Sequence, residues 1–188
     1  PTSTLHLKRV TPKITGEDAE RLGVTDLLGV GRSNFAGSPT NRRRNIALGR
    51  SKMNGILIGP GDTFSQLNVL GTIDGAHGLL PELVIKGTET VPEYGGGLCQ
   101  ISSTTFRAAL ASGLPIVERR NHSFRVRYYE PAGTDATIYD PAPDFKFKND
   151  TPGHLLITTQ IQGDELLFFV WGTPDGRVTS STKPVVYN

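Results

Sequence analysis

Three consecutive glycines lead directly into a helical pattern that starts at the only cysteine of this 188-residue chain. The run Gly95-Gly96-Gly97-Leu98-Cys99 can adopt positive φ and approach a ligand closely, because glycine has no Cβ. From Cys99 to about Ala111 the residues keep helical spacing, and Gly113 followed by Pro115 predicts the end of the helix. A helix that begins at the thiol directs unpaired N–H groups at the sulfur, which lowers its pKa and favours the thiolate.

The other patterns predict an α+β fold in which the helix that bears the cysteine packs on a mostly antiparallel sheet. Two helices are expected before it, a short one near residues 15–23 and a longer one over 38–54. From Val117 the hydrophobic period changes to two, which predicts a β-hairpin within 117–139. The other expected strands are 56–58, 83–91, 145–148, and a second hairpin of 155–161 and 166–171.

Composition limits the function classes. The formal net charge is +2, and no long basic face with interleaved aromatic residues is present, so nucleic-acid binding is not expected. The basic run Arg42-Arg43-Arg44 is interpreted as a solvated helix face in preference to a binding role, which stays the alternative. One cysteine excludes an internal disulfide, and no compact metal-ligand spacing occurs, so no metal or cofactor is predicted.

No apolar run is long enough to span a bilayer, and no signal peptide is seen. We therefore expect a membrane connection only through an anchor outside this chain. The predicted organisation is a lead-in at 1–29, one domain at 30–175 and a tail at 176–188.

A cysteine acyl-transfer enzyme needs a thiolate, a base and a group that holds the tautomer of the base. Cys99 supplies the thiol, and His122, at the start of an alternating stretch, is the natural base. Cysteine at a helix start, histidine on the next strand and a polar residue on the following strand is the order of papain-like and transglutaminase-like enzymes. That order is an analogy for the arrangement of elements.

Two aspartates compete for the third position. If a hairpin turns around Ala132, His122 faces roughly position 142, and this register favours Asp140. Asp135 lies just past that turn and would be distant from His122 in the same register. The residues alone therefore leave Asp135 and Asp140 as rivals.

The remaining candidate residues would bind the substrate or its oxyanion. An oxyanion needs N–H donors, and the backbone amides of Cys99 or Gln100 and the Gln100 side chain are available. Gly96 and Gly97 would let the backbone approach the substrate. A substrate carboxylate would need a cation, for which Arg119, Arg120 and Arg125 are candidates because they are close to His122 in sequence.

Several motifs in this order resemble the VanW domain family, over about residues 30–172. The similar segments are 34–38, Asn41-Arg42, Asn45-Ile46, 59–65, 95–104, 117–119, His122-Ser123, 133–137 and the end near 144–149. The chain has leucine where isoleucine is common before the cysteine. The family takes its name from an accessory protein of glycopeptide resistance clusters.

The resemblance implies a bacterial cell-surface, extracytoplasmic protein, and the stretch before residue 30 resembles the end of a peptidoglycan-binding region. Some members are associated with L,D-transpeptidation of peptidoglycan through the motif cysteine. Carried over, Cys99 is the nucleophile and His122 its base, and Asp135 stands in the Asp-Ala-Thr block of the family. The resemblance therefore favours Asp135 over Asp140, against the hairpin register, and we select Asp135.

The resulting hypothesis is a cysteine acyltransferase, similar to L,D-transpeptidases, whose partners are peptidoglycan stem peptides. Two alternatives stay open. In a non-catalytic peptidoglycan-binding module, Cys99 would be buried packing and the glycine run would shape a groove. In a cysteine endopeptidase or amidase, the same residues would act on a different bond.

Overall fold

The structure is a computed structural model, and it describes residues 16–86 and 89–182. It is an α+β fold with mainly antiparallel sheets, as predicted. The helices are α1 (Gly16–Arg21), α2 (Thr40–Met53), α3 (Gln66–Leu70) and α4 (Leu98–Ala111), with a 3-10 turn η1 (Arg127–Tyr129). The strands are β1 (Asp26–Asn34), β2 (Ile56–Ile58), β3 (Thr63–Ser65), β4 (Pro81–Lys86), β5 (Glu89–Tyr94), β6 (Ile116–Glu118), β7 (Lys146–Lys148), β8 (Leu155–Gln162) and β9 (Glu165–Gly172).

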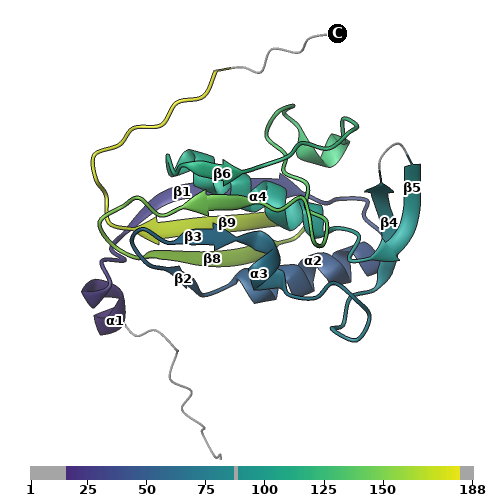
Figure 1. Ribbon diagram of the computed structural model, residues 1–188, viewed down its shortest axis with the longest axis horizontal. Helices are drawn as coiled ribbons and strands as arrows, with labels where there is room; N and C mark the ends of the chain where they lie inside the picture. The colour runs from purple at the N-terminus through teal and green to yellow at the C-terminus, as the bar shows by residue number, and fades with distance from the viewer. Residues whose placement is uncertain (1–15, 87–88, 183–188) are drawn as a thin grey trace, which may run out of the picture.

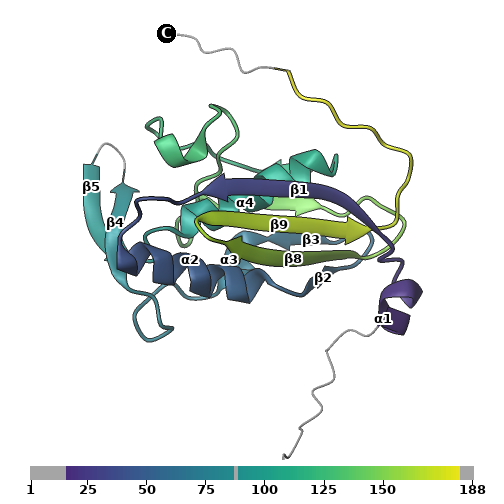
Figure 2. The same ribbon diagram turned by 180° about the vertical axis from the view of Figure 1, so that it is seen from behind.

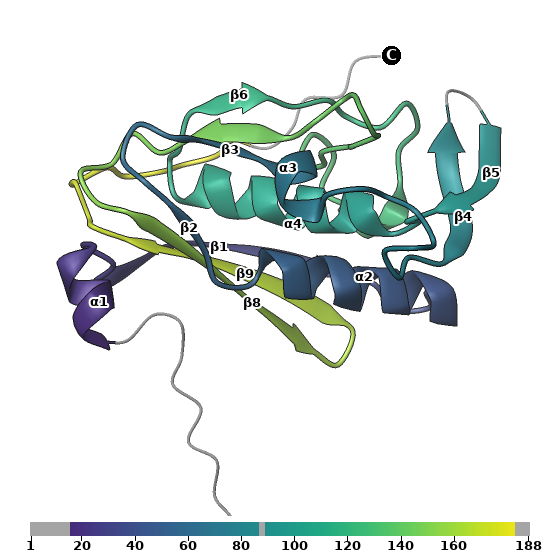
Figure 3. The same ribbon diagram turned by 60° about the horizontal axis from the view of Figure 1, so that its bottom comes forward.

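Helix α4 lies between two sheets (Figure 3). On one side is a four-stranded sheet of order β1-β9-β8-β2, and on the other is a three-stranded sheet of order β3-β7-β6. Helix α2 packs against both α4 and β8. Figure 2 shows β1, β9 and β8 side by side on the face opposite to that of Figure 1. The helix that bears Cys99 is thus the middle layer, and most of its side chains are buried.

The close packing of α4 on β1 depends on two glycines. Alternate residues of a strand face the same side, and Gly29, Gly31 and Ser33 are the buried positions that face α4. A Cβ on Gly31 would lie 2.0 Å from the carbonyl oxygen of Thr104 and 2.7 Å from the amide nitrogen of Ala108. Only glycine allows the strand and the helix backbones to approach this closely.

Substitution of Gly31 by alanine should therefore lower the free energy of unfolding by about 3 kcal/mol or more, because backbone atoms of α4 must move to admit the methyl group. Urea denaturation followed by circular dichroism measures the change. Gly16→Ala is the matched control, because no atom lies within 4 Å of a Cβ at that position. A Gly31→Ala variant as stable as the parent would contradict the packing described for α4 and β1.

Aromatic side chains join α4 to the three-stranded sheet. Phe106 of α4 meets Phe145 edge to face at 5.6 Å between ring centroids. Phe64 of β3 stacks on Phe147 of β7 at 4.8 Å. Both Phe145 and Phe147 are fully buried. These contacts hold the three-stranded sheet against α4.

The hairpin of β4 and β5 projects beyond the ends of α2 and α4 (Figure 1). Its two strands are antiparallel, and Pro81 at the start of β4 pairs with Tyr94 at the end of β5. Leu83 is 60% exposed and Tyr94 is 49% exposed, although both are large and partly apolar. The hairpin therefore presents apolar side chains to solvent next to the helix start.

Several sequence predictions are confirmed. Helix α2 ends at Met53, is capped by Asn54 and is followed by Gly55 at φ +85°, and α4 ends before Gly113 at φ +66°. The hairpin of β8 and β9, the short strands β2 and β7 and the small helix α1 also form where expected. The strand predicted over 83–91 is instead two paired strands, β4 and β5.

The hairpin predicted within 117–139 is wrong. Strand β6 ends at Glu118, and the described chain between Arg119 and Phe145 contains only η1. The alternating pattern does not correspond to a buried face, because Phe124 is 47% exposed whereas Tyr129 is buried. Guanidinium groups, rather than a second strand, bind many of the backbone carbonyls in this segment: Arg107 alone donates to the carbonyl oxygens of residues 129, 130 and 134.

Strand β1 crosses the predicted boundary at residue 30. Residues 26–29 pair with β9 and belong to the four-stranded sheet. The division into lead-in, domain and tail stays a prediction, and residues 1–15 of the lead-in lie outside the described residues.

Candidate active site

Cys99 lies in the first turn of α4, where the glycine run sets the approach of the chain. Gly97 is the residue before the helix and has φ +110°, a value that side chains rarely adopt, and Gly95 has φ +84°. The N–H of Leu98 donates to Gly95, and the N–H of Gln100 donates to Gly97. Within the described residues the N–H of Cys99 makes no such bond. Of the two backbone amides considered as donors to an oxyanion, that of Gln100 is therefore occupied and that of Cys99 is not.

His122 and Asp135 are joined by two hydrogen bonds. The imidazole Nδ1 of His122 lies 2.6 Å from Asp135 Oδ2, and the backbone N–H of His122 donates to the same oxygen at 2.8 Å. Burial raises the pKa of Asp135, but its hydrogen bonds with His122 outweigh burial and lower it to about 2. The carboxylate is therefore ionised, Nδ1 is the protonated donor, and Nε2 is directed to other partners.

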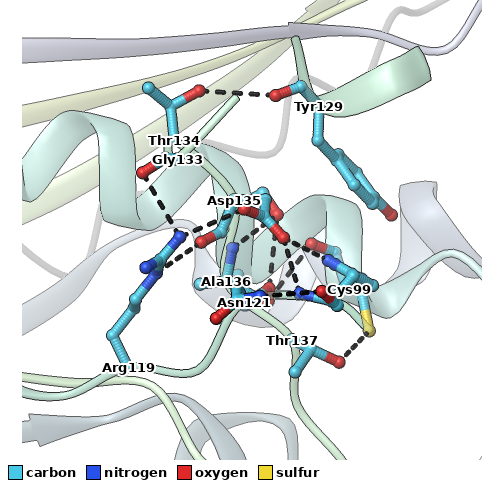
Figure 4. A network of polar contacts seen from close by, with 12 residues as sticks. Cys99, Arg119, Asn121, Tyr129, Gly133, Thr134, Asp135, Ala136 and Thr137 are labelled. Atoms are coloured by element: carbon cyan, nitrogen blue, oxygen red, sulfur yellow. Dashed lines mark hydrogen bonds and ion pairs between the residues drawn. The ribbon is translucent and has the colours of Figure 1, made fainter. Parts of the chain in front are cut away.

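Arg119 fixes the other side of Asp135. Its Nε donates to the backbone oxygen of Asp135 at 2.7 Å, and its Nη2 lies 3.1 Å from Oδ1 (Figure 4). The guanidinium also covers the ring of Phe106 at 5.1 Å. Arg119 therefore positions the aspartate and does not line the cleft described below.

The thiol of Cys99 and the imidazole of His122 interact. Burial raises the pKa of the Cys99 thiol, but a hydrogen bond with His122 and the charge of that ring lower it overall. Burial lowers the pKa of His122, whereas hydrogen bonds with Asp135 and Cys99 raise it to about 9. Both directions favour a thiolate next to an imidazolium. The sulfur also lies 3.5 Å from the Thr137 hydroxyl and 3.5 Å from the Ile138 carbonyl oxygen.

Two hydroxyls of α4 hold the aspartate segment against the helix. Ser102 and Ser103 both donate to the carbonyl oxygen of Ala136, and the N–H of Ala136 donates back to Ser103 at 3.0 Å. Since Ala136 lies between Asp135 and Thr137, these bonds bring both residues beside Cys99 (Figure 4). Ser102 and Ser103 thus have a structural role, which is to hold this segment against α4.

Tyr129 covers His122. Their rings stack with centroids 4.6 Å apart and an interplanar angle of 23°. Tyr129 is buried, and burial together with the nearby charge of Cys99 raises the pKa of its hydroxyl well above the usual range, although Arg42 opposes the rise with a hydrogen bond. A neutral aromatic face against an imidazolium is a favourable cation–π arrangement.

The sulfur and the imidazole line an open cleft of about 900 Å³. One wall is the β4–β5 hairpin, with Leu83 and Tyr94, and the other is the segment 120–143. The hydroxyl of Tyr139 donates to Glu93 at 2.8 Å and so links the two walls. The size suits a ligand of several residues, because small-molecule sites occupy about 300–1,000 Å³.

Asp140 lies in the wall of the same cleft and is exposed. The ring nitrogen Nδ1 of His122 is bonded to Asp135, so the geometry unites Cys99, His122 and Asp135. The register that favoured Asp140 does not exist, because its hairpin does not form. Neither His122 nor Asp135 lies on a strand, so the papain-like placement of these two residues on strands is not found.

Of the other residues predicted to bind the substrate or its oxyanion, only some line the cleft. Gln100 is fully buried, with its amide bonded to Arg42 and Ser33, and so faces away from the cleft. Gly97 lines the cleft, whereas Gly96 is buried behind it and its carbonyl accepts from Asn45.

Among the arginines proposed for a substrate carboxylate, Arg120 is exposed and lines the cleft. Arg125 is bound to Glu130 at 2.5 Å, at the surface. The site also contains Arg42, Tyr129 and Thr137, which no sequence pattern had indicated. The interpretation of Arg42 as part of a solvated face is wrong, because Arg42 is buried and lines the cleft.

The reactivity of Cys99 follows from the pKa directions. Iodoacetamide should alkylate Cys99 at pH 6, where an ordinary thiol is only about 0.3% ionised. The rate should be at least about tenfold lower in His122→Gln, because the imidazolium that stabilises the thiolate is lost. His77→Gln, which removes an exposed imidazole, is the control. A rate that rises with pH as it does for a free cysteine peptide would contradict the ion pair.

None of the helices in the described part of the chain has the length and hydrophobicity needed to span a bilayer. No group of three or more histidine, cysteine, aspartate or glutamate side chains in the same part of the chain could hold a metal ion.

Fold and site together define an α+β domain in which a cysteine at a helix start, a histidine and an aspartate meet in an open cleft. The family described as VanW like protein matches residues 41–171. Since this match covers most of the chain, the protein belongs to the VanW family, as the sequence motifs indicated.

Two relatives are similar to the chain. The uncharacterized protein YoaR of Bacillus subtilis is 32% identical over 164 residues, which is 87% of this chain and 54% of YoaR. The vancomycin B-type resistance protein VanW of Enterococcus faecalis is 33% identical over 116 residues, which is 59% of this chain and 42% of that protein. The chain thus spans about half the length of these relatives. No solved structure matches the chain significantly.

Proposed function

We propose that this protein is an extracytoplasmic cysteine acyltransferase, similar to L,D-transpeptidases, that acts on peptidoglycan stem peptides. The single observation that carries the proposal is the contact of the Cys99 thiol with an imidazole that Asp135 orients, in a cleft open to solvent. A buried structural cysteine would need neither the histidine nor the cleft. Membership of the VanW family supports the choice of a cell-wall substrate.

The proposed reaction has two steps. The Cys99 thiolate attacks the carbonyl carbon of the third residue of a donor stem, and a C–S bond forms. The N–H of Cys99 donates to the oxyanion. His122 gives its proton to the leaving amine, the peptide C–N bond breaks, and the terminal D-amino acid departs.

In the second step an acceptor amine attacks the thioester carbon. His122 takes a proton from that amine, the C–S bond breaks, and the thiolate of Cys99 returns with a new amide bond, a 3-3 cross-link. If water attacks instead, the product is a free tripeptide acid. His122 gives one proton in the first step and takes one back in the second, so it returns to its starting state. This chemistry therefore uses neither a metal nor a cofactor.

Intact-protein mass spectrometry tests the proposal. The protein is incubated with a purified disaccharide-tetrapeptide, and the expected adduct has the mass of the disaccharide-tripeptide acyl group, with free D-alanine in solution. Addition of an acceptor stem should discharge the adduct into a cross-linked dimer. Both products follow from attack of the thiolate on the third carbonyl.

Other products distinguish the alternatives. Cleavage between other residues, or release of the sugar, would replace the proposal by an endopeptidase or an amidase. Binding of the muropeptide with neither adduct nor product would replace it by a non-catalytic wall-binding module. Absence of both binding and turnover would exclude stem peptides as partners.

A further inference from the structure

Arg42 is a buried arginine in the floor of the cleft. Its side chain comes from α2, the residue as a whole is 8% exposed, and it lines the same cleft as Cys99. Its Nη1 donates to the Ser38 hydroxyl at 2.6 Å, and its Nη2 donates to the Gln100 amide oxygen at 2.7 Å. The ring of Tyr128 covers its guanidinium at 4.3 Å.

All of these partners are neutral, and so is the Tyr129 hydroxyl, which also hydrogen-bonds with Arg42 and whose pKa lies well above the usual range. Among the described residues, no aspartate or glutamate lies within ion-pair distance of Arg42. The next residue differs, since Arg43 lies 2.7 Å from Asp164. A charge removed from water without a counter-charge is costly, and proteins usually pair it. The buried guanidinium at a cleft therefore lacks an anion that a ligand can supply.

The arginine is also tied to the nucleophile. Gln100 follows Cys99 in the chain, and its fully buried amide joins Arg42 to Ser33 of β1. Gly97, the residue before α4, passes so close that a Cβ there would lie 3.0 Å from Arg42 Cγ. The guanidinium is thus held in one orientation next to the first turn of α4. A planar fork held in this way suits a carboxylate.

We infer that Arg42 binds a free carboxylate of the donor peptide, and that this contact selects donors for Cys99. The inference rests on the proposed function. The α-carboxylate of the terminal D-residue is the first source to consider, because it lies one residue, about 3.8 Å along the chain, from the carbonyl that is attacked. A side-chain carboxylate on the third residue is the second source.

Binding to the Cys99→Ala protein tests the inference without turnover. Three tetrapeptides serve as probes: one with the free carboxylates, one with a terminal carboxamide, and one with a carboxamide on the side chain of the third residue. Isothermal titration calorimetry should show the terminal carboxamide binding about tenfold or more weakly than the free acid, the loss expected for a charge-assisted contact. If only the side-chain carboxamide weakens binding, the carboxylate bound by Arg42 is that of the third residue.

Substitutions of Arg42 provide the second half of the test. Arg42→Gln in the same background should bind acid and carboxamide equally, whereas Arg42→Lys should keep part of the preference because it keeps the charge. Arg44→Gln is the matched control, since Arg44 is exposed on the same helix and its loss changes the net charge equally. If the Arg42→Gln variant does not fold, the binding of the three peptides to the Cys99→Ala protein, which keeps Arg42, still tests the inference.

The outcomes separate the two proposals. Equal binding of all three peptides to the Cys99→Ala protein overturns the inference, and the proposed function then stands or falls on the thioester adduct. Lack of any binding overturns the inference as well. A purely structural role for Arg42 predicts that Arg42→Gln weakens acid and carboxamide binding by the same factor, and that result would also overturn it.

Discussion

Replacement of Cys99 by alanine should reduce the release of D-alanine from a tetrapeptide donor by at least about a thousandfold. No other nucleophile can form the thioester, because Cys99 is the only cysteine and the neighbouring hydroxyls of Ser102 and Ser103 are bonded to Ala136. The measurement is D-alanine release over time, with liquid chromatography of the muropeptide as the second readout.

The control is the stability of the variant. Cys99 lies at the cleft and is only partly buried, so the loss of its sulfur should change the free energy of unfolding by about 1 kcal/mol or less. A folded Cys99→Ala protein that still releases D-alanine at the parent rate would remove Cys99 as the nucleophile. The proposed function would then be lost with it.

The helix start was predictable from the sequence because its determinants are local. Three glycines, a cysteine and a helical pattern that ends at Gly113 are consecutive along the chain, and each has a backbone reason that acts over a few residues. The histidine was predictable as a partner for the thiol, and the choice of Asp135 came from a family motif. The geometry now places the carboxylate of that residue 2.6 Å from the imidazole.

The remaining parts of the site depend on tertiary contacts that no local pattern encodes. Arg42 meets Gln100 across 58 positions, and its charged neighbours in sequence made it look like part of a solvated helix face. Arg119 was predicted to bind substrate because it is close to His122 in sequence, yet it donates to Asp135. Spacing along the chain cannot tell which arginine turns toward the cleft and which toward the aspartate.

Two errors in the predicted fold have the same origin. The first is that no strand was predicted where β1 forms, because Gly29 and Gly31 lower the strand propensity of this segment. These glycines are there because α4 passes close to the strand. In the segment after β6, alternating aromatic residues imitate a strand, but Arg107 and Arg119 bind its carbonyls from outside. In both cases a partner distant in sequence decides the local structure.

Substitution of Asp135 by asparagine should lower the rate of D-alanine release by about a hundredfold to ten-thousandfold while leaving the cleft intact. Burial lowers the pKa of His122, and the Asp135 carboxylate is one of the two groups, with Cys99, that raise it. Without the carboxylate the imidazolium is less populated at neutral pH, and the Cys99 thiolate that it stabilises is reduced with it. Asparagine can also present its amide group to Nδ1 and favour the other tautomer.

The free energy of unfolding that Asp135→Asn loses relative to the parent should depend on pH, because the pKa values of both His122 and Asp135 are shifted in the folded parent. His122 has its pKa raised from 6.5 to about 9, so its contribution is complete below pH 6.5 and is lost as the pH rises through 9. Asp135 has its pKa lowered from 3.8 to about 2, so its contribution is present above pH 3.8 and is lost as the pH falls through 2. Urea denaturation should therefore show the largest deficit of Asp135→Asn between about pH 4 and 6.5.

Asp140→Asn provides the matched control, because it removes one exposed carboxylate from the wall of the same cleft. It should keep the parent dependence of stability on pH, since Asp140 is not the carboxylate bonded to the His122 ring at Nδ1. Its rate of D-alanine release should stay within about a factor of three of the parent, the change expected when a surface charge is removed. If Asp140→Asn loses more activity than Asp135→Asn, the orienting carboxylate is Asp140 and the cleft must close around His122 when substrate binds.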